Sequence, residues 1–213
     1  MRWQHCGGSS PFLGTSSLIH PRAAFPVSGI LVALGATIYN FSIRLSDVDR
    51  GVYEALALKL ARHPSESAEY LVTRLLAYCL EYAEGIAFSC GLSDPEEPAL
   101  SVRDLTGAMR SWIEIGAPDA ARLHKASKAA PRVALYTHRP PEQIRNQLAG
   151  EKIHRAESLE LYAIDRDLIA GFVQRLERRM KLELSVSDGQ LYLSIGESTL
   201  SGTVERIDLG SLG

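Results

Sequence analysis

The sequence predicts one domain of the α/β class, in its α+β form, in which helices flank a mixed β-sheet. Short stretches with alternating apolar and polar residues recur along the chain, which is typical of half-buried strands. Between them lie stretches with an apolar residue every three or four positions, as in helices that cover a sheet. A length of 213 residues suffices for one sizeable core.

The composition narrows the class of protein. Hydrophobic residues make up 46% of the chain and charged residues 23%, which is typical of a globular protein. A formal net charge of −2 disfavours strong non-specific DNA binding, so any contact with nucleic acid would use a local patch. The three cysteines lack metal or redox spacing, which indicates a reducing cytoplasm, and Cys79 is expected in the core. The apolar stretch 29–43 is shorter than the ~20 residues of a membrane helix.

The N-terminal residues are expected to lie outside the domain. Prolines at positions 11, 21 and 26 interrupt the apolar residues of the first 31 positions, so the layout of a secretion signal is absent. We therefore expect residues 1–31 to be a disordered or non-native upstream extension. Residues 32–213 are expected to form a single domain.

The first part of that domain is predicted to contain a hairpin and a helix. Alternation over residues 36–45 and 52–60 predicts two strands around the turn residues 47–51, although the second stretch also suits a helix. Residues 64–84 carry the clearest helical pattern, with Pro64 and Glu66 expected in its first turn and Gly85 at its end.

The centre of the chain is predicted to run helix, three antiparallel strands, helix, strand. The strands are 86–89, 100–103 and 109–115, with a tight turn at Thr106–Gly107 between the last two. Pro118–Asp119 opens the second helix, and 132–137 is the next strand. Further on we expect a helix at 142–148, a strand at 159–164, a helix at 165–179, a hairpin of 181–186 and 191–195, and a last strand at 200–207.

The central hairpin carries the candidate metal ligands. A tip at Thr106–Gly107 puts Ala99 opposite Glu114, so Glu97 becomes a diagonal neighbour of Glu114 on one face, close enough to share a divalent metal. Trp112 lies on that face as well. Asp104 points to the other face, ~16 Å along the strand from Glu114, and is kept as a reserve ligand.

Two further residues can approach this face. Lys125 lies in the helix after Glu114, and Glu66 lies at the start of the long helix. Carboxylates that hold Mg²⁺ or Mn²⁺ beside a lysine are what metal-assisted phosphodiester hydrolysis needs. The competing interpretation is structural: Glu66 stabilises its helix start, Glu114 and Glu97 are ion-paired or solvated, and Lys125 and Arg122 belong to an ordinary basic helix face. The histidines at positions 63, 124 and 138 are interpreted as local hydrogen-bonding residues.

Several segments resemble one family of small bacterial proteins. They are Ala36-Thr-Ile-Tyr39, Ala61-Arg-His-Pro-Ser-Glu66, Asp104-Leu-Thr-Gly107, Trp112-Ile-Glu-Ile-Gly116 and Lys125-Ala126. In this order they resemble the YaeQ family, from about residue 33 to near the C-terminus. The resemblance implies a variant of the PD-(D/E)XK nuclease fold: a restriction endonuclease-like core with extra N- and C-terminal strands. Such proteins begin near Val32, so a start codon there would explain the extension.

The resemblance also implies roles for single residues. Glu114 corresponds to the acid of the (D/E)XK half-motif, but its lysine is replaced by Gly116. Lys125, or Lys128 as the alternative, would supply that cation from the neighbouring helix. Glu97 or Asp104 would stand for the first acid of the motif. Glu66 resembles the glutamate that the first helix of many such nucleases places beside the metal.

These inferences lead to one functional hypothesis and two competitors. The chain is predicted to be a cytoplasmic nuclease, using Mg²⁺ or Mn²⁺, with Glu97 and Glu114 as ligands and Lys125 and Glu66 in support. The first competitor is a non-catalytic binding or regulatory module on a degenerate nuclease scaffold. The second is a metal-dependent hydrolase of smaller phosphate compounds. The oligomeric state is left open.

Overall fold

The computed structural model describes residues 35–89 and 96–209. The predicted extension 1–31 lies outside the described residues, as do Cys90 and residues 91–95. All described residues belong to one compact unit, Gly35–Gly213.

The described part of the chain forms ten strands and four α-helices. In chain order they are β1 (Thr37–Asp47), β2 (Val52–Arg62), α1 (Ala68–Leu80), β3 (Ile86–Phe88), β4 (Leu100–Arg103), β5 (Met109–Ile115), α2 (Ala120–Ala129), β6 (Arg132–Thr137), α3 (Pro141–Leu148), β7 (Leu159–Ile164), α4 (Arg166–Val173), β8 (Arg179–Ser187), β9 (Gln190–Ile195) and β10 (Ser198–Arg206), with a short 3₁₀ helix at Ala156–Ser158. None of the helices in this part is long and apolar enough to cross a membrane.

The strands join in one mixed sheet, in the order β2-β1-β8-β9-β10-β7-β6-β5-β4-β3. Strands β3, β4 and β5 pair antiparallel, whereas β5, β6 and β7 run parallel. A second parallel pair, β1 with β8, links the N-terminal hairpin to the C-terminal strands. The predicted mixed α+β sheet is therefore confirmed. The assignment of its centre to the restriction endonuclease-like class stays a prediction.

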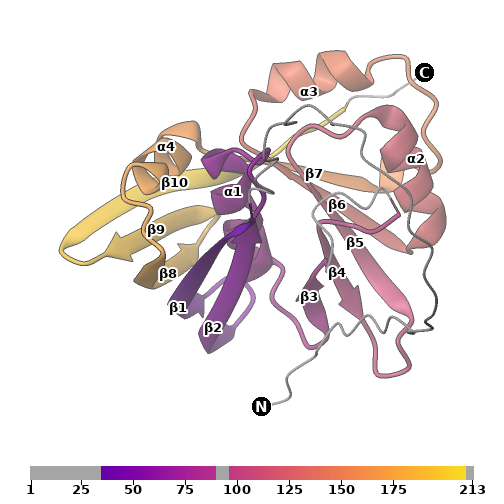
Figure 1. Ribbon diagram of the computed structural model, residues 1–213. Helices are drawn as coiled ribbons and strands as arrows, with labels where there is room; N and C mark the ends of the chain where they lie inside the picture. Colours follow the sequence, from indigo (N-terminus) through magenta and orange to yellow (C-terminus); the bar gives the residue numbers. More distant parts are fainter. Residues whose placement is uncertain (1–34, 90–95, 210–213) are drawn as a thin grey trace, which may run out of the picture. The chain divides into compact units, whose positions relative to one another are not determined.

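Helices cover both faces of the parallel strands. Figure 1 shows α1 between two groups of strands, β1, β2 and β8–β10 on one side and β3–β7 on the other. Residues of α1, α4 and both strand groups share one buried cluster. A second cluster joins α2 and α3 to the opposite face of β5, β6 and β7. Because β5 is covered on both faces, all of its residues from Ser111 to Ile115 are buried.

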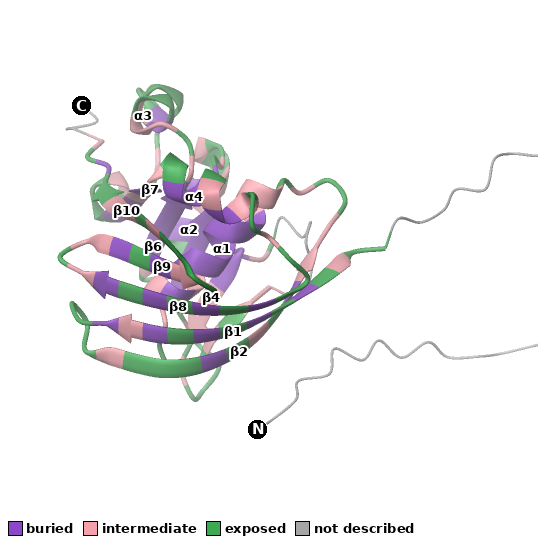
Figure 2. Cartoon of the chain, turned by 90° about the vertical axis from the view of Figure 1, so that its left-hand side faces the viewer, coloured by how far each residue is buried: buried purple, intermediate pink, exposed green. Residues whose placement is uncertain are grey.

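The N-terminal hairpin shows the predicted alternation. Along β1 the buried side chains of Tyr39, Phe41, Ile43 and Leu45 alternate with outward-facing polar ones. Figure 2 shows the same alternation of buried and exposed residues along β8. The strand interpretation of residues 52–60 is confirmed, since β2 pairs with β1 along its whole length.

The start of the long helix was predicted wrongly. Helix α1 begins at Ala68 because the Ser67 side chain caps it, accepting a hydrogen bond from the Tyr70 amide at 3.1 Å. Pro64 and Glu66 lie in a separate turn, in which the Glu66 amide donates to the His63 carbonyl. The helix also ends earlier than predicted, at Leu80.

Gly85 has a different role from the predicted helix stop. It lies in the turn that leads to β3, and a β-carbon there would come within 1.9 Å of the Arg103 carbonyl oxygen. Its lack of a side chain allows β4 to pass close by. The helix that begins at Arg166 is also shorter than predicted, since α4 ends at Val173.

The tip of the central hairpin differs from the prediction, whereas its body matches. Leu100 pairs with Ile113 and Val102 with Ser111, as predicted. Near the tip the register shifts, so Arg103 pairs with Met109. The amide of Asp104 donates to the Ala108 carbonyl at 3.0 Å, which leaves a three-residue loop instead of a tight two-residue turn.

Candidate functional site

Glu114 is a buried carboxylate near the C-terminal end of β5. Glu114 is 2% exposed, and its side chain lies on the same face of β5 as that of Trp112, as predicted. The Trp112 indole N–H donates to Glu114 Oε1 at 2.5 Å, and Arg122 Nε lies 2.8 Å from the same oxygen. Burial raises the pKa of Glu114, while the Trp112 hydrogen bond and Arg122 act in the opposite direction.

Arg122 joins Glu114 to the segment that precedes β4. Asp119 caps α2 by accepting from the Arg122 amide at 2.8 Å, which places Arg122 in the first turn of the helix. Its Nη2 donates to the Glu97 carbonyl at 2.8 Å. One guanidinium therefore contacts both residues that were predicted to share a metal, through the side chain of Glu114 and the backbone of Glu97.

Lys125 lies farther along α2 and contacts a different acid. Its ammonium group forms an ion pair with Glu96, and its side chain is 38% exposed. The basic group in contact with Glu114 is thus Arg122, not Lys125. In the structural interpretation of the sequence, Arg122 was expected, with Lys125, on an ordinary basic helix face.

Gly116 explains why the lysine of the half-motif is absent from β5. Its backbone has a φ of +88°, in the left-handed region that favours glycine. A β-carbon there would meet the Tyr70 ring at 3.6 Å, an ordinary contact, so the obstacle to a side chain is the backbone conformation. A cation for this site has to come from a neighbouring element.

Glu66 forms the second acid and arginine pair of this region. Its Oε1 lies 3.4 Å from Arg74 Nη1, and its Oε2 accepts from the His63 amide at 3.1 Å. Arg74 is buried, and its Nη2 donates to the Ala61 carbonyl at 2.8 Å. Arg74 Nε is a buried donor with no hydrogen-bond partner among the described residues.

Tyr70 lies near both pairs. Burial raises the pKa of its hydroxyl, and the charges of Arg74, Glu66, Glu114 and Arg122 act on it as well. The structure thus brings Glu66 and Glu114 to the surroundings of one tyrosine, although they come from the turn before α1 and the end of β5. We call this group, Glu66, Tyr70, Arg74, Glu114 and Arg122, the double-pair site.

Asp104 lies apart from the double-pair site. Its carboxylate accepts from the Thr106 amide at 2.9 Å, the Thr106 hydroxyl at 2.6 Å and the Ala108 amide at 3.0 Å, and it pairs with Arg110 at 2.9 Å. The hydrogen bond from the Thr106 hydroxyl is the largest of the effects that lower the pKa of Asp104. Because Asp104 lies opposite Ala108, six positions of strand separate it from the level of Glu114, which corresponds to ~20 Å. The longer loop therefore does not bring the reserve ligand to Glu114.

The carboxylates of the described residues do not gather into a closed metal cage. Within residues 35–89 and 96–209, no three side chains of His, Cys, Asp or Glu lie close enough to hold one ion. Any divalent ion at the double-pair site would therefore take one or two carboxylates from the chain. Mg²⁺ is often bound in this way, with waters and phosphate oxygens as the remaining ligands.

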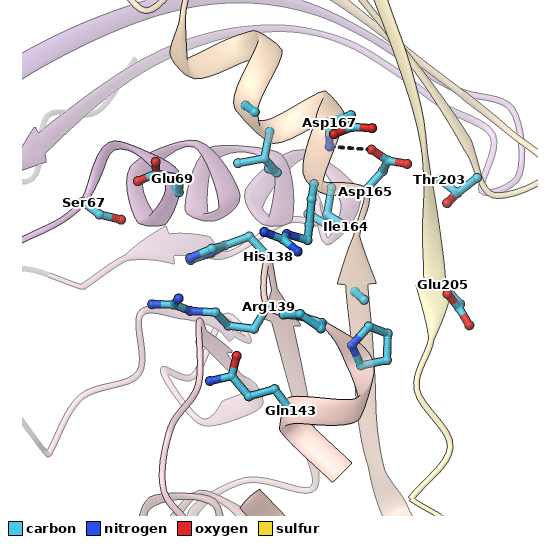
Figure 3. A pocket seen from close by; sticks show the side chains of 16 residues that line it. Ser67, Glu69, His138, Arg139, Gln143, Ile164, Asp165, Asp167, Thr203 and Glu205 are labelled. Carbon is cyan, nitrogen blue, oxygen red and sulfur yellow. Dashed lines mark hydrogen bonds between the residues drawn. The ribbon is translucent and has the colours of Figure 1, made fainter. Parts of the chain in front are cut away.

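A cleft of about 990 Å³ opens at the C-terminal ends of β6 and β7. It is lined by the residues that follow these strands and by the N-terminal turns of α1, α3 and α4, as Figure 3 shows. Among them are His138, Arg139, Gln143, Asp165 and Arg166. Clefts at the carboxyl ends of parallel strands are where α/β proteins commonly bind ligands.

His138 is held at this cleft by a hydrogen bond to α1. The Thr73 hydroxyl donates its proton to the Glu69 carbonyl at 2.7 Å, so its 3.1 Å contact with His138 Nδ1 has the nitrogen as donor. The neutral ring then carries its lone pair on Nε2. Burial lowers the pKa of His138, and nearby Arg139 lowers it further. His138 therefore makes a hydrogen bond within the chain, as predicted.

The comparison with known proteins agrees with the segments named above. The family model of the YaeQ protein matches residues 32–204. The chain belongs to the YaeQ family. The uncharacterized protein YaeQ of Escherichia coli (strain K12) is 36% identical over 171 residues, which cover 79% of this chain and 94% of that protein.

Crystal structures from the YaeQ family share the fold. The YaeQ protein from Pseudomonas syringae superposes with a TM-score of 0.73 at 31% identity, covering 84% of this chain and 98% of its own. The YaeQ protein from Xanthomonas axonopodis pv. citri gives a TM-score of 0.72 at 30% identity, covering 80% of this chain and 97% of its own. At these identities the mixed sheet and its helices are common to family members.

The sequence analysis missed the arginines of this YaeQ family member and its cleft. A signal for Arg122 existed, because a residue three positions after the cap Asp119 lies in the first turn of α2, near the end of β5. No local sequence pattern predicted the pairing of Arg74 with Glu66 or the position of the cleft. Their surroundings come from elements that are distant in the sequence.

Proposed function

We propose that the chain cleaves nucleic acid phosphodiesters with the help of Mg²⁺ or Mn²⁺, bound by Glu114 of the double-pair site and by the neighbouring Glu97. The observation that supports this proposal is the convergence of two oxygen donors, the Glu114 carboxylate and the Glu97 carbonyl, on one cationic group. Carboxylate and carbonyl oxygens are the donors that these divalent ions take in proteins. These two oxygens therefore suit a divalent ion. In the structure, the Arg122 guanidinium supplies the positive charge that contacts them.

In this proposal Glu114 and Glu97 hold the ion, and Asp104 remains in its turn. When bound, the ion supplies an activated water and neutralises charge on the phosphate. Arg122 and Lys125 bind phosphate oxygens from α2, and Glu66 fixes the Arg74 guanidinium beside Tyr70.

A calorimetric titration of the full chain with Mn²⁺ tests the metal site. Wild type is expected to bind the ion, and Glu114→Gln to lose at least ~10-fold in affinity, because an ionised ligand is replaced by a neutral amide. Asp104→Asn is the matched control, an acid outside the site, and should bind like wild type. Cleavage of labelled single- and double-stranded oligonucleotides in Mn²⁺ then follows the same order. Equal affinity of wild type and Glu114→Gln would contradict the assignment.

A second candidate function is a non-catalytic binding module. One observation favours it: three of the candidate acids already form ion pairs within this chain. Glu66 pairs with Arg74, Glu114 with Arg122 and Asp104 with Arg110. In this case Arg122 is the permanent counter-ion of Glu114. The variant Arg122→Gln separates the two functions, since it should strengthen Mn²⁺ binding in the enzyme and leave a binding module without metal affinity.

A further inference from the structure

We propose that the cleft at the ends of β6 and β7 binds a small phosphate monoester, with the phosphate between His138, Arg139 and Arg166. This site is separate from Glu114, and the inference stands without the proposed nuclease activity. The cleft volume of about 990 Å³ is at the upper end of the range for small-molecule sites.

The two arginines at the cleft form no ion pair with any of the described residues. Arg139 and Arg166 are both exposed, and throughout the described part of the chain neither guanidinium has a hydrogen bond or ion pair. The positive charges of both arginines lower the pKa of His138. Figure 3 shows the side chains of His138 and Arg139 next to each other, extending to the same side with Gln143. Guanidinium groups bind phosphate oxygens in pairs, which suits a terminal phosphate.

His138 completes this phosphate subsite because its orientation is already fixed. Thr73 holds Nδ1, so Nε2 is the nitrogen left for a ligand. Three charged groups act on the ring: Glu69 from α1, Arg139 beside it and Arg166 from α4. A bound dianion adds negative charge and favours the protonated ring, in which Nε2 donates to a phosphate oxygen.

Three of the four acidic side chains of the cleft limit the ligand to one phosphate. Figure 3 places Asp165, Asp167 and Glu205, with Thr203, away from His138 and Arg139, at the other end of the cleft, whereas the fourth acid, Glu69, lies on the side of His138. Asp165 uses Oδ1 to cap α4, accepting from the Asp167 amide at 2.8 Å. Carboxylates at that end accept hydrogen bonds from hydroxyl or amino groups and repel a second phosphate. The ligand class is therefore a sugar phosphate or a similar monophosphate, in preference to a bisphosphate or a nucleic acid strand.

Titration calorimetry of the full chain without divalent metal tests this site. The probes are inorganic phosphate, fructose 6-phosphate, fructose 1,6-bisphosphate and a single-stranded oligonucleotide. We expect fructose 6-phosphate to bind best, and the double variant Arg139→Gln, Arg166→Gln to lose at least ~10-fold in affinity. Arg179→Gln, an exposed arginine of β8 outside the cleft, is the matched control and should bind like wild type. Both cleft arginines are exposed, so the variant is expected to fold.

Two further readouts separate this site from the proposed nuclease. Glu114→Gln should bind fructose 6-phosphate like wild type, so failure of one proposal leaves the other standing. In NMR spectra of the His138 ring, saturating fructose 6-phosphate should raise the pKa of His138. Absence of binding to wild type, an unchanged affinity of the double variant, or tighter binding of the bisphosphate or oligonucleotide would each overturn the inference.

Discussion

The two ends of the parallel strands β5, β6 and β7 differ in how completely their polar side chains pair with one another. At the N-terminal ends, Arg132 donates to both carboxylate oxygens of Glu81, at 2.6 and 2.9 Å, and to both of Glu160, at 3.0 and 2.5 Å. The hydroxyls of Tyr136 and Tyr162 donate to the same two carboxylates, at 2.8 and 3.1 Å. Every charged group of this network has a partner.

At the C-terminal ends the pairing is incomplete. Within the described residues, Arg74 Nε is buried without a partner, and the guanidinium groups of Arg139 and Arg166 have none. A paired network fixes strands and helices relative to one another, whereas a buried donor without a partner, such as Arg74 Nε, costs stability. The exposed guanidinium groups of Arg139 and Arg166 are hydrated and remain available to a ligand. The difference indicates that the N-terminal ends contribute to stability, and it is consistent with the binding sites that we propose at the C-terminal ends.

Replacing Arg132 should cause the largest loss of stability. Arg132→Gln leaves the carboxylates of Glu81 and Glu160 close together without a counter-ion, and we expect a loss of about 2 kcal/mol, below the value for a fully buried pair because Arg132 is 34% exposed. Urea unfolding measures this loss. Arg132→Lys is the control and should lose less, since it keeps the charge without the forked geometry. A loss under about 0.5 kcal/mol would contradict the stabilising role.

The pH dependence of stability should reveal the raised pKa of Glu114. Burial raises the pKa of Glu114 in the folded protein above its value in the unfolded chain, which is near 4.5. At pH values between these two pKa values, the native state binds more protons than the unfolded state. The free energy of unfolding of wild type should therefore fall with rising pH in this window, relative to Glu114→Gln. Trp112→Phe removes a hydrogen bond to the carboxylate and should widen the window. Parallel pH profiles of wild type and Glu114→Gln would rule out a raised pKa.

The hairpin tip should give the smallest effect. Asp104→Ala removes the acceptor for Thr106 and Ala108, and we expect the midpoint of thermal unfolding to fall by only about 1–3 °C. Asp104→Asn keeps an oxygen acceptor and should stay closer to wild type. Both variants should bind Mn²⁺ and fructose 6-phosphate like wild type. A loss of either ligand would mean that Asp104 reaches a binding site.

Local patterns predicted most of the strands and the register of the central hairpin. The body of the β4–β5 pair follows the predicted register, because alternation fixes which residues face each other. The helix starts were harder. Ser67 and Pro64 are both good start signals, and the choice between them depended on side-chain contacts of Glu66 with Arg74 and His63.

The candidate site was only partly predictable. The closeness of Glu97 to Glu114 followed from strand pairing, and the structure shows it through their shared contact with Arg122. The choice of Arg122 over Lys125 depends on the rotation of α2 about its axis, which the cap at Asp119 sets. The cleft depends on the parallel pairing of β6 with β7, and no local pattern specifies such a pairing.

The parallel pair of β1 and β8 has a consequence for how the chain folds during synthesis. Arg44 and Glu183 form an ion pair across these strands although 139 positions separate them. At ~5–20 residues per second a ribosome needs roughly 7–28 s to make that stretch. During this time the finished β1–β2 hairpin has an open edge, which can pair with another nascent chain. A chain that ends before β8 therefore lacks the strand that closes this edge.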